Sequence, residues 1–338
     1  MIVEMKTGVS QQEVEQVVER ARSLGFGVQM NCGTDKTVVA ILGSATGQTP
    51  VDVFALLPGV EQVIRIMKPY KLASREFKPQ PTLVKVNGVE VGGPRVVIMA
   101  GPCAVESEEQ VRETALAVKA AGASILRGGA FKPRTSPFSF QGLEEEGLKI
   151  LSKVKKEVGI PVITEVMDTH DVDLVAQHAD ILQVGARNMQ NFALLKELSK
   201  LRQPVMLKRG FSATITEWLT AADYLLAEGN DRVILCERGI RTFEDSTRFT
   251  LDISAVPVVR RFSHLPVIID PSHAAGFSQY VPTLAKAAIA AGADGLLIEV
   301  HPNPVQALVD GLQALNLPSF QQLMVELKAI AQAVGRSL

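Results

Sequence analysis

The sequence has few cysteines and no excess of charge of either sign, and each shortage excludes a class of protein. Its three cysteines, Cys32, Cys103 and Cys236, are far apart and outside any Cys-x-x-Cys motif, which argues against a disulfide-stabilised scaffold. The formal net charge is -1, so no overall basic field attracts nucleic acid or an anionic membrane. Any anion must therefore be bound locally.

Long apolar runs are also missing. No uninterrupted stretch reaches the roughly 18 apolar residues of a membrane-spanning helix, and the opening residues, MIVEMKTG, lack the apolar core of a signal peptide. We therefore expect a cytoplasmic protein. The chain has 338 residues and 46% hydrophobic content, which together predict a globular protein with a large core.

Residues 1–67 have the pattern of a small α+β domain. Apolar segments at 2–5, 26–30, 37–43 and 60–66 predict strands, and helices are expected at 10–25 and 50–57. Ser10 and Glu13 form a capping-box pattern at the start of the first helix. The order βαββαβ is that of a ferredoxin-like domain. Because this segment carries one cysteine and no histidine, we expect it to serve binding or assembly.

A linker and a hairpin are predicted between residues 68 and 93. Residues 68–81 are polar, basic and bounded by prolines, as is typical of a linker. Asn87 and Gly88 then stand between alternating apolar residues, which predicts a β-hairpin. We expect this hairpin to cap the second domain without joining its main sheet.

Residues 94–338 repeat a unit of apolar strand, polar strand end and helix. Strands rich in Val, Ile and Leu are typical of a parallel sheet covered on both faces. They are expected at 96–101, 124–129, 161–166, 180–186, 204–210, 232–239, 266–273 and 295–301. Eight such units predict a (β/α)₈ TIM barrel. An open doubly wound sheet is the alternative, but the sequence lacks the glycine fingerprint of a dinucleotide fold.

Each predicted strand carries a reactive or charged side chain at or just past its C-terminal end. These residues are Cys103, Arg127, Glu165, Arg187, Lys208, Arg209, Glu237, Arg238, Asp270, His273, Glu299 and His301. Barrel enzymes have their active sites at this end of the strands. The placement therefore predicts one shared active site.

Cations dominate the predicted site. The segment RGGAFKPRTSPFSFQG, residues 127–142, holds Arg127, Lys132 and Arg134 and no acid. Arg187, Lys208, Arg209 and Arg238 follow other strands. Arginine forks match carboxylate and phosphate oxygens, so small, multiply anionic substrates are expected. The alternative interpretation of each cation is a surface residue paired with an acid on a helix. For Arg209 this interpretation and a role in the site are equally favoured.

A metal site is a second possibility at the same rim. Cys103, His273, Glu299 and Asp310 lie at or beyond strand ends, and a thiolate, an imidazole and two carboxylates suit a divalent transition ion better than Mg²⁺ or Ca²⁺. The spacing alone is a weak signal because the four residues are scattered along the chain. Packing is the competing interpretation of Cys103.

Several motifs resemble one enzyme family closely. They are AGPCAVES, LRGGAFKPRTSPFSFQG, QVGARNMQNF, VMLKRG, ILCERGIRTF, DPSHAAG and IEVHPNP. Together they resemble 3-deoxy-D-arabino-heptulosonate 7-phosphate (DAHP) synthase, in the short form whose ferredoxin-like regulatory domain precedes the barrel. The resemblance implies a transferase of the shikimate pathway, which supplies aromatic amino acid biosynthesis. Members condense phosphoenolpyruvate (PEP) with erythrose 4-phosphate and release phosphate.

The resemblance also implies roles for particular residues. Cys103, His273, Glu299 and Asp310 are the implied ligands of a divalent ion, with Mn²⁺, Fe²⁺, Co²⁺ and Zn²⁺ all open. The implied PEP contacts are Arg127, Lys132, Arg187, Lys208, Arg238 and the backbone of Ala186. Arg134, Thr135 and Ser136 are the implied contacts of erythrose 4-phosphate. As hypotheses for the chemistry, Lys132 donates a proton and Glu165 orients or deprotonates water. A homotetramer inhibited by tyrosine or phenylalanine is also implied.

Three other functions stay open at this point. Octulosonate 8-phosphate synthases use arabinose 5-phosphate, but they typically carry Ala-Asn-Arg-Ser where this chain has Pro133, Arg134, Thr135 and Ser136. An aldolase that forms a Schiff base on Lys208 is a second alternative. A noncatalytic sugar-phosphate sensor is the third. For residues 1–67, a role in assembly alone competes with effector binding.

Overall fold

The computed structural model describes residues 1–32, 36–65, 68–133 and 136–338. The chain divides into two compact units. The first comprises Met1–Pro81 together with Phe262–His264, and the second comprises Thr82–Arg261 and Leu265–Leu338.

The first unit is the expected ferredoxin-like domain. Its described part contains a four-stranded antiparallel sheet in the order β2-β3-β1-β4. The elements are β1 (Ile2–Met5), α1 (Gln11–Ser23), β2 (Gly27–Cys32), β3 (Thr37–Leu42), a 3₁₀ turn (Ser44–Gly47), α2 (Asp52–Ala55) and β4 (Val60–Ile64). The Ser10–Glu13 capping box that opens α1 is present. Apolar residues of α1 and α2, including Val17, Val18 and Phe54, pack with those of the sheet in one core.

The segment predicted as a linker is more buried than its polar composition suggests. Tyr70, Leu72, Ala73 and Phe77 are all buried, and the segment belongs to the first unit. The side-chain amide of Asn31, on β2, donates to the carbonyl of Phe77 at 3.3 Å. The segment is therefore held in place by the burial of these four apolar side chains, which stand among prolines and lysines in the sequence.

The second unit is the expected (β/α)₈ barrel. Among the described residues, eight parallel strands close on themselves in the order β10-β11-β12-β13-β14-β7-β8-β9. They are β7 (Val97–Gly101), β8 (Ile125–Arg127), β9 (Val162–Val166), β10 (Ile181–Val184), β11 (Val205–Lys208), β12 (Val233–Glu237), β13 (Val267–Ile269) and β14 (Gly295–Glu299). The fold predicted from the repeated strand pattern is therefore confirmed.

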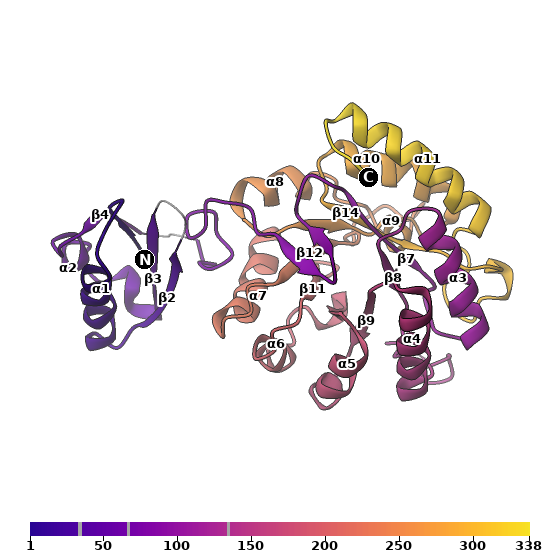
Figure 1. Ribbon diagram of the computed structural model, residues 1–338, viewed down its shortest axis with the longest axis horizontal. Helices are drawn as coiled ribbons and strands as arrows, with labels where there is room; N and C mark the ends of the chain where they lie inside the picture. Colours follow the sequence, from indigo (N-terminus) through magenta and orange to yellow (C-terminus); the bar gives the residue numbers. More distant parts are fainter. Residues whose placement is uncertain (33–35, 66–67, 134–135) are drawn as a thin grey trace. The chain divides into compact units, whose positions relative to one another are not determined.

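Helices surround the barrel strands, as Figure 1 shows. They are α3 (Glu108–Ala120), α4 (Glu144–Val158), α5 (Val172–His178), α6 (Phe192–Ser199), α7 (Ile215–Ala227), α8 (Ala255–Phe262), α9 (Pro271–Ala275), α10 (Val281–Ala290) and α11 (Leu317–Ala333). Short 3₁₀ turns lie at Thr169–Asp171, Ala186–Asn188, Ser278–Tyr280 and Pro304–Gln306. In the described residues, no helix is long and apolar enough to cross a membrane.

The Asn87–Gly88 hairpin is present and packs against the barrel core. Its strands are β5 (Val84–Val86) and β6 (Val89–Val91). Val84, Val86 and Val91 belong to the same apolar cluster as inward-facing residues of the barrel strands. Asn87 has a φ of 44° and Gly88 a φ of 86°, the left-handed pair that a tight hairpin turn requires. The hairpin thus contributes to the barrel core without joining its closed sheet.

Candidate active site and metal-binding group

Four potential metal ligands meet at the C-terminal rim of the barrel. Ligand atoms of Cys103, His273, Glu299 and Asp310 all lie within 4.8 Å of one another. Cys103 follows β7, His273 lies in α9, Glu299 ends β14 and Asp310 lies in the loop after β14. We call these four residues the metal group. Cys103 is therefore not surrounded by apolar side chains alone, as a cysteine that serves only packing would be.

The loop that carries Asp310 has an unusual backbone. Asp310 has a φ of 54°, in the left-handed region that non-glycine residues seldom adopt. A Cβ on the next residue, Gly311, would lie 2.2 Å from the carbonyl oxygen of Pro304, so glycine is required there. Strained backbone of this kind concentrates at functional sites. The strain places the Asp310 carboxylate beside the Cys103 thiol, with Oδ2 and Sγ 3.4 Å apart.

The protonation of the metal group suits a soft divalent ion. Burial, reinforced by the charge of Glu299, raises the pKa of Cys103 to about 12. A bound ion would therefore take the place of the thiol proton. Burial also lowers the pKa of His273, against the opposing effect of Asp270 and Glu299, which favours the neutral imidazole that metals bind. Sulfur, nitrogen and oxygen donors in one group fit a transition ion.

Buried charges surround the metal group. Nη1 of Arg127 donates to Oε1 of Glu299 at 2.5 Å. Burial alone would raise the pKa of Glu299, but His273 and Arg127 hold it below its ordinary value. Asp270 is fully buried and accepts from Nδ1 of His273 and from Nζ of Lys208, both at 2.7 Å. Glu299 and Asp270 are therefore carboxylates at neutral pH.

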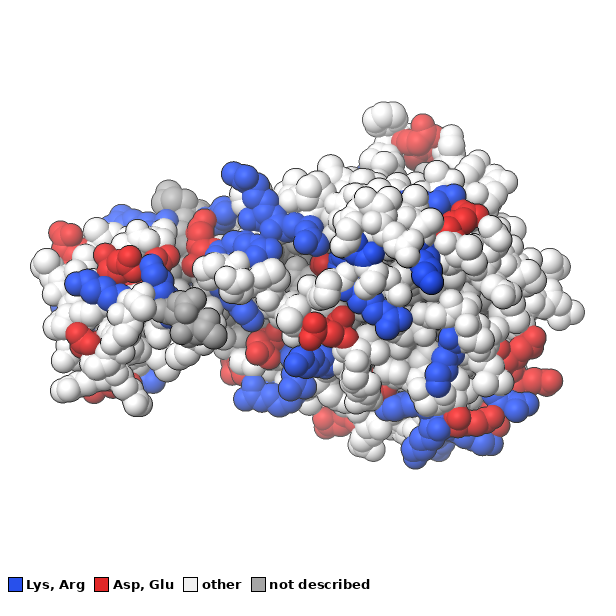
Figure 2. Space-filling model, turned by 45° about the horizontal axis from the view of Figure 1, so that its top comes forward, with Lys and Arg blue, Asp and Glu red and all other residues white. Residues whose placement is uncertain are grey.

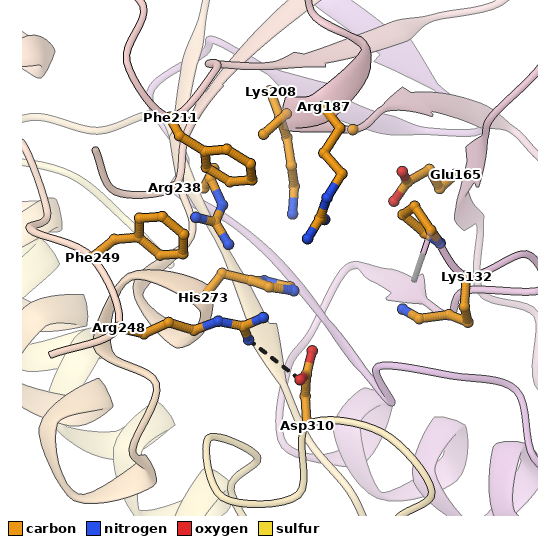
Figure 3. A pocket seen from close by; sticks show the side chains of 13 residues that line it. Lys132, Glu165, Arg187, Lys208, Phe211, Arg238, Arg248, Phe249, His273 and Asp310 are labelled. Carbon is orange, nitrogen blue, oxygen red and sulfur yellow. Dashed lines mark ion pairs between the residues drawn. The ribbon is translucent and has the colours of Figure 1, made fainter. Parts of the chain in front are cut away.

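A cationic pocket opens beside the metal group (Figure 3). It is lined by Lys132, Pro133, Glu165, Gly185, Ala186, Arg187, Lys208, Phe211, Arg238, Arg248, Phe249, His273 and Asp310. Figure 3 shows Arg187 and Lys208 pointing toward His273 from one side. On another side, Nζ of Lys132 lies 3.1 Å from Sγ of Cys103. The pocket and the metal group are thus parts of one site.

Arg238 lies beside a stacked pair of aromatic rings in the pocket, at a similar distance from both. The rings of Phe211 and Phe249 stack with centroids 4.9 Å apart, and the guanidinium carbon of Arg238 lies 4.8 and 4.2 Å from their centroids. Burial lowers the pKa of Arg238 to about 10, so the group stays charged at neutral pH. Among the described residues, its buried Nη1 has no hydrogen-bond partner. An anionic ligand would satisfy this donor.

The structure brings most of the predicted site residues together. Lys132, Glu165, Ala186, Arg187, Lys208 and Arg238 all line the pocket. Arg127 lies instead against Glu299 in the metal group. Oγ of Ser136 accepts from the backbone of Phe138 at 3.3 Å, and Ser136 is not among the lining residues. Arg134 and Thr135 lie outside the described residues.

Arg209, a strand-end cation, lies apart from the pocket. It is buried and pairs with Glu237 at 3.0 Å and Asp252 at 2.8 Å. Cys236 belongs to the apolar cluster inside the barrel.

Sequence reasoning missed four residues at the site. Phe211, Arg248 and Phe249 line the pocket, and Gln313 contacts Glu299. All four lie in loops beyond the strand ends, where no periodic pattern in the sequence indicates which way a side chain points. The only available signal was the presence of an arginine and of phenylalanines in the loops after β11 and β12.

The face shown in Figure 2 carries both Lys and Arg and Asp and Glu side chains, in line with the net charge of -1.

The closed (β/α)₈ barrel has its pocket at the C-terminal rim, where barrel enzymes keep their active sites. The cations of the pocket suit anionic ligands. The chain belongs to the DAHP synthetase I family, whose family model matches residues 72–333. A second model, the DAHP synthase ferredoxin-like domain, matches residues 1–68.

Individual relatives agree with this assignment. The chain is 48% identical, over 99% of both sequences, to a phospho-2-dehydro-3-deoxyheptonate aldolase of Thermotoga maritima. It is similar to the crystal structure of a DAHP synthase from that organism, with a TM-score of 0.80 at 47% identity over 99% of this chain and 98% of the other. A 2-dehydro-3-deoxyphosphooctonate aldolase of Koribacter versatilis is 34% identical over 74% of this chain and 96% of its own.

Proposed function

We propose that this enzyme condenses PEP with D-erythrose 4-phosphate and water, giving DAHP and inorganic phosphate. One observation carries the proposal: five cations line a pocket whose wall also includes two residues of the metal group. Two phosphorylated substrates repel each other, and the excess of positive charge offsets this repulsion. The family model and the Thermotoga maritima relative support the same reaction.

The cations that line the pocket are the proposed PEP contacts, and they differ in how far they are already paired. Lys208 is already paired with Asp270, whereas Arg238 keeps a buried donor open. Arg187 lies with its guanidinium carbon 5.4 Å from the centroid of the Phe211 ring. We assign PEP to Lys132, Arg187, Lys208, Arg238 and the backbone of Ala186, together with Arg127, which pairs with Glu299 of the metal group. Erythrose 4-phosphate is assigned to Arg134, Thr135 and Ser136.

The metal group is the proposed site of a divalent ion, Mn²⁺, Fe²⁺, Co²⁺ or Zn²⁺. Such an ion supplies Lewis-acid chemistry that polarises the aldehyde oxygen. Carbon 3 of PEP bonds to the aldehyde carbon, water adds to carbon 2 and phosphate then leaves. Nζ of Lys132 lies at the boundary between pocket and metal group, which supports its role as proton donor. Glu165 accepts from Gln183 at 3.0 Å, and this contact orients it as the group that holds the attacking water.

The assay that tests the reaction measures phosphate release from PEP with either of two aldoses. We expect turnover with erythrose 4-phosphate and at least tenfold less with arabinose 5-phosphate, and removal of metal by a chelator should abolish it. The reverse preference would identify an octulosonate 8-phosphate synthase, the activity named for the Koribacter versatilis relative. Borohydride trapping of PEP-derived carbon on Lys208, with chelator insensitivity, would indicate a Schiff-base aldolase. No phosphate release would favour a sensor.

We also propose a division of labour along the chain, with residues 1–67 regulatory, 68–93 linker and hairpin, and 94–338 catalytic. The ferredoxin-like domain supports binding of an aromatic effector, tyrosine or phenylalanine, in a cytoplasmic homotetramer. Titration of activity with each amino acid tests this role. Inhibition should occur in the full chain and disappear on deletion of residues 1–67, and unchanged inhibition after the deletion would assign these residues to assembly alone.

A further inference from the structure

We propose that Gln313 and Arg248 are positioning residues that determine which oxygen of Glu299 and which oxygen of Asp310 faces the metal ion. We call the pair the carboxylate brace. The inference rests on the metal dependence proposed above, and it assigns to both residues a role in metal affinity.

The two oxygens of Glu299 have different partners. Oε1 lies 3.3 Å from Nε2 of His273 and accepts from Arg127, so this oxygen is on the side of the other ligands. Oε2 accepts from Nε2 of Gln313 at 2.6 Å. Gln313 is only 2% exposed, so water does not compete for its amide. The hydrogen bond therefore prevents the carboxylate from rotating Oε1 away from the group.

The two carboxylate oxygens of Asp310 also have different partners. Its Oδ2 is the oxygen beside Sγ of Cys103, and its Oδ1 lies 3.3 Å from Nη1 of Arg248. Figure 3 shows this ion pair at the edge of the pocket. One oxygen thus faces the metal group, and the other is held by a cation.

Arg248 and Gln313 act as one unit because of their chemistry. Nη1 of Arg248 donates to Oε1 of Gln313 at 2.9 Å. A guanidinium can only donate and an ionised carboxylate can only accept. The amide between them is therefore satisfied in one orientation, with its oxygen toward Arg248 and its nitrogen toward Glu299. Arg248 thereby fixes both carboxylates, directly at Asp310 and through Gln313 at Glu299.

The brace completes a set of outer contacts around the metal group. His273 is held through Nδ1 by Asp270, and the brace holds the two carboxylates. Outer contacts of this kind fix ligand orientation, and their loss typically weakens metal affinity roughly 10- to 100-fold.

Mn²⁺ binding to the full-length protein tests the inference. We expect Gln313→Leu and Arg248→Met each to weaken Mn²⁺ binding by about 10- to 100-fold in calorimetric titration. The double variant should be little weaker than Arg248→Met alone, because the loss of Arg248 already removes the contact with Asp310 and the support of Gln313. Gln306→Leu is the matched control: Gln306 is exposed in the same loop, so its Mn²⁺ affinity should equal that of the unchanged protein.

Thermal unfolding of the metal-free proteins separates positioning from folding. A purely structural role would lower the melting temperature without a change in Mn²⁺ affinity, and that result would overturn the inference. Arg248 has a side chain 38% exposed, so its variant supplies the test if Gln313→Leu does not fold. If the unchanged protein binds no Mn²⁺, Co²⁺ or Zn²⁺, the metal dependence itself is wrong, and the brace is overturned with it.

Discussion

At the residue scale, more cations of the site are paired with carboxylates than the sequence suggests. The loop 127–142 contains no acid, yet Arg127 is paired with Glu299 from the far end of the barrel sequence. Lys208 is likewise paired with Asp270. Closure of the barrel brings these partners together. The cations could be predicted from strand ends, but which of them stay open to a ligand could not.

Lys132 gives the sharpest test at this scale. Its ammonium donates to the carbonyl oxygen of Cys103 at 3.0 Å as well as contacting the thiol. Lys132→Met should reduce turnover by a factor of at least 100, in line with loss of a general acid, while metal content by elemental analysis stays unchanged. Lys149→Met, at an exposed position on α4, is the control and should retain activity. Near-native turnover of Lys132→Met would exclude the proposed role.

Arg238 tests the aromatic wall of the pocket. A planar guanidinium packs alongside the two stacked rings and keeps several N–H donors for a ligand, whereas an ammonium does not fill the same space. Arg238→Lys should therefore raise the KM for PEP about tenfold or more, measured in initial-rate assays. Arg241→Lys, at an exposed position of the same loop, should leave KM unchanged. Equal KM values for the two variants would contradict the assignment of PEP to this wall.

At the scale of elements, the strands and their turns were the most predictable part of the molecule. The barrel strands were predicted because they are apolar on both faces, and the hairpin because Asn87–Gly88 suits a left-handed turn. The segment 68–81 was less predictable, since its burial depends on four apolar residues that form no periodic pattern. Phe211, Phe249 and Gln313 were missed for a related reason, because loop conformation sets their orientation.

The hairpin turn yields a stability prediction. Asn87 adopts a positive φ, and its side chain donates to Asp180 at 2.6 Å. Asn87→Ala should lower the free energy of unfolding by about 1–2 kcal/mol, since alanine disfavours this conformation. Asn87→Gly keeps the backbone and should be milder. Chemical denaturation of both variants checks the order, and a milder alanine variant would show that backbone conformation is not the cause.

At the scale of the whole molecule, the barrel fold could be predicted because the same strand–helix unit repeats eight times in the sequence. Eight similar units constrain the topology strongly, because parallel strands with helical connections close into a barrel of this size. Residues 1–67 were assigned with equal success from the order of their elements. Sequence does not give the relative placement of the four ligands, which depends on strand tilt and on the strained turn at Asp310.

Acid sensitivity is expected from His264. This side chain is buried in the first unit, with Nε2 2.7 Å from the carbonyl oxygen of Leu72. Burial lowers its pKa from 6.5 to about 4, so the unfolded chain takes up a proton more readily than the folded one. Stability is therefore complete above pH 6.5 and is lost as the pH falls toward 4, by up to about 3 kcal/mol.

Thermal unfolding at pH 7 and pH 4.5 measures this loss. His264→Gln should flatten the pH dependence of the melting temperature, and His170→Gln, at an exposed position, should not. An unchanged slope in His264→Gln would assign the acid sensitivity to other groups.

The barrel and the sheet of the ferredoxin-like domain differ in how they end. In the described residues the barrel strands pair in a full circle, whereas the four-stranded sheet terminates at β2 and β4. Open strand edges offer backbone donors and acceptors to strands of other molecules. Aggregation during storage or heating should therefore begin by edge-to-edge pairing in the ferredoxin-like domain, and a lysine introduced on the outer edge of β2 should delay it while leaving the barrel untouched.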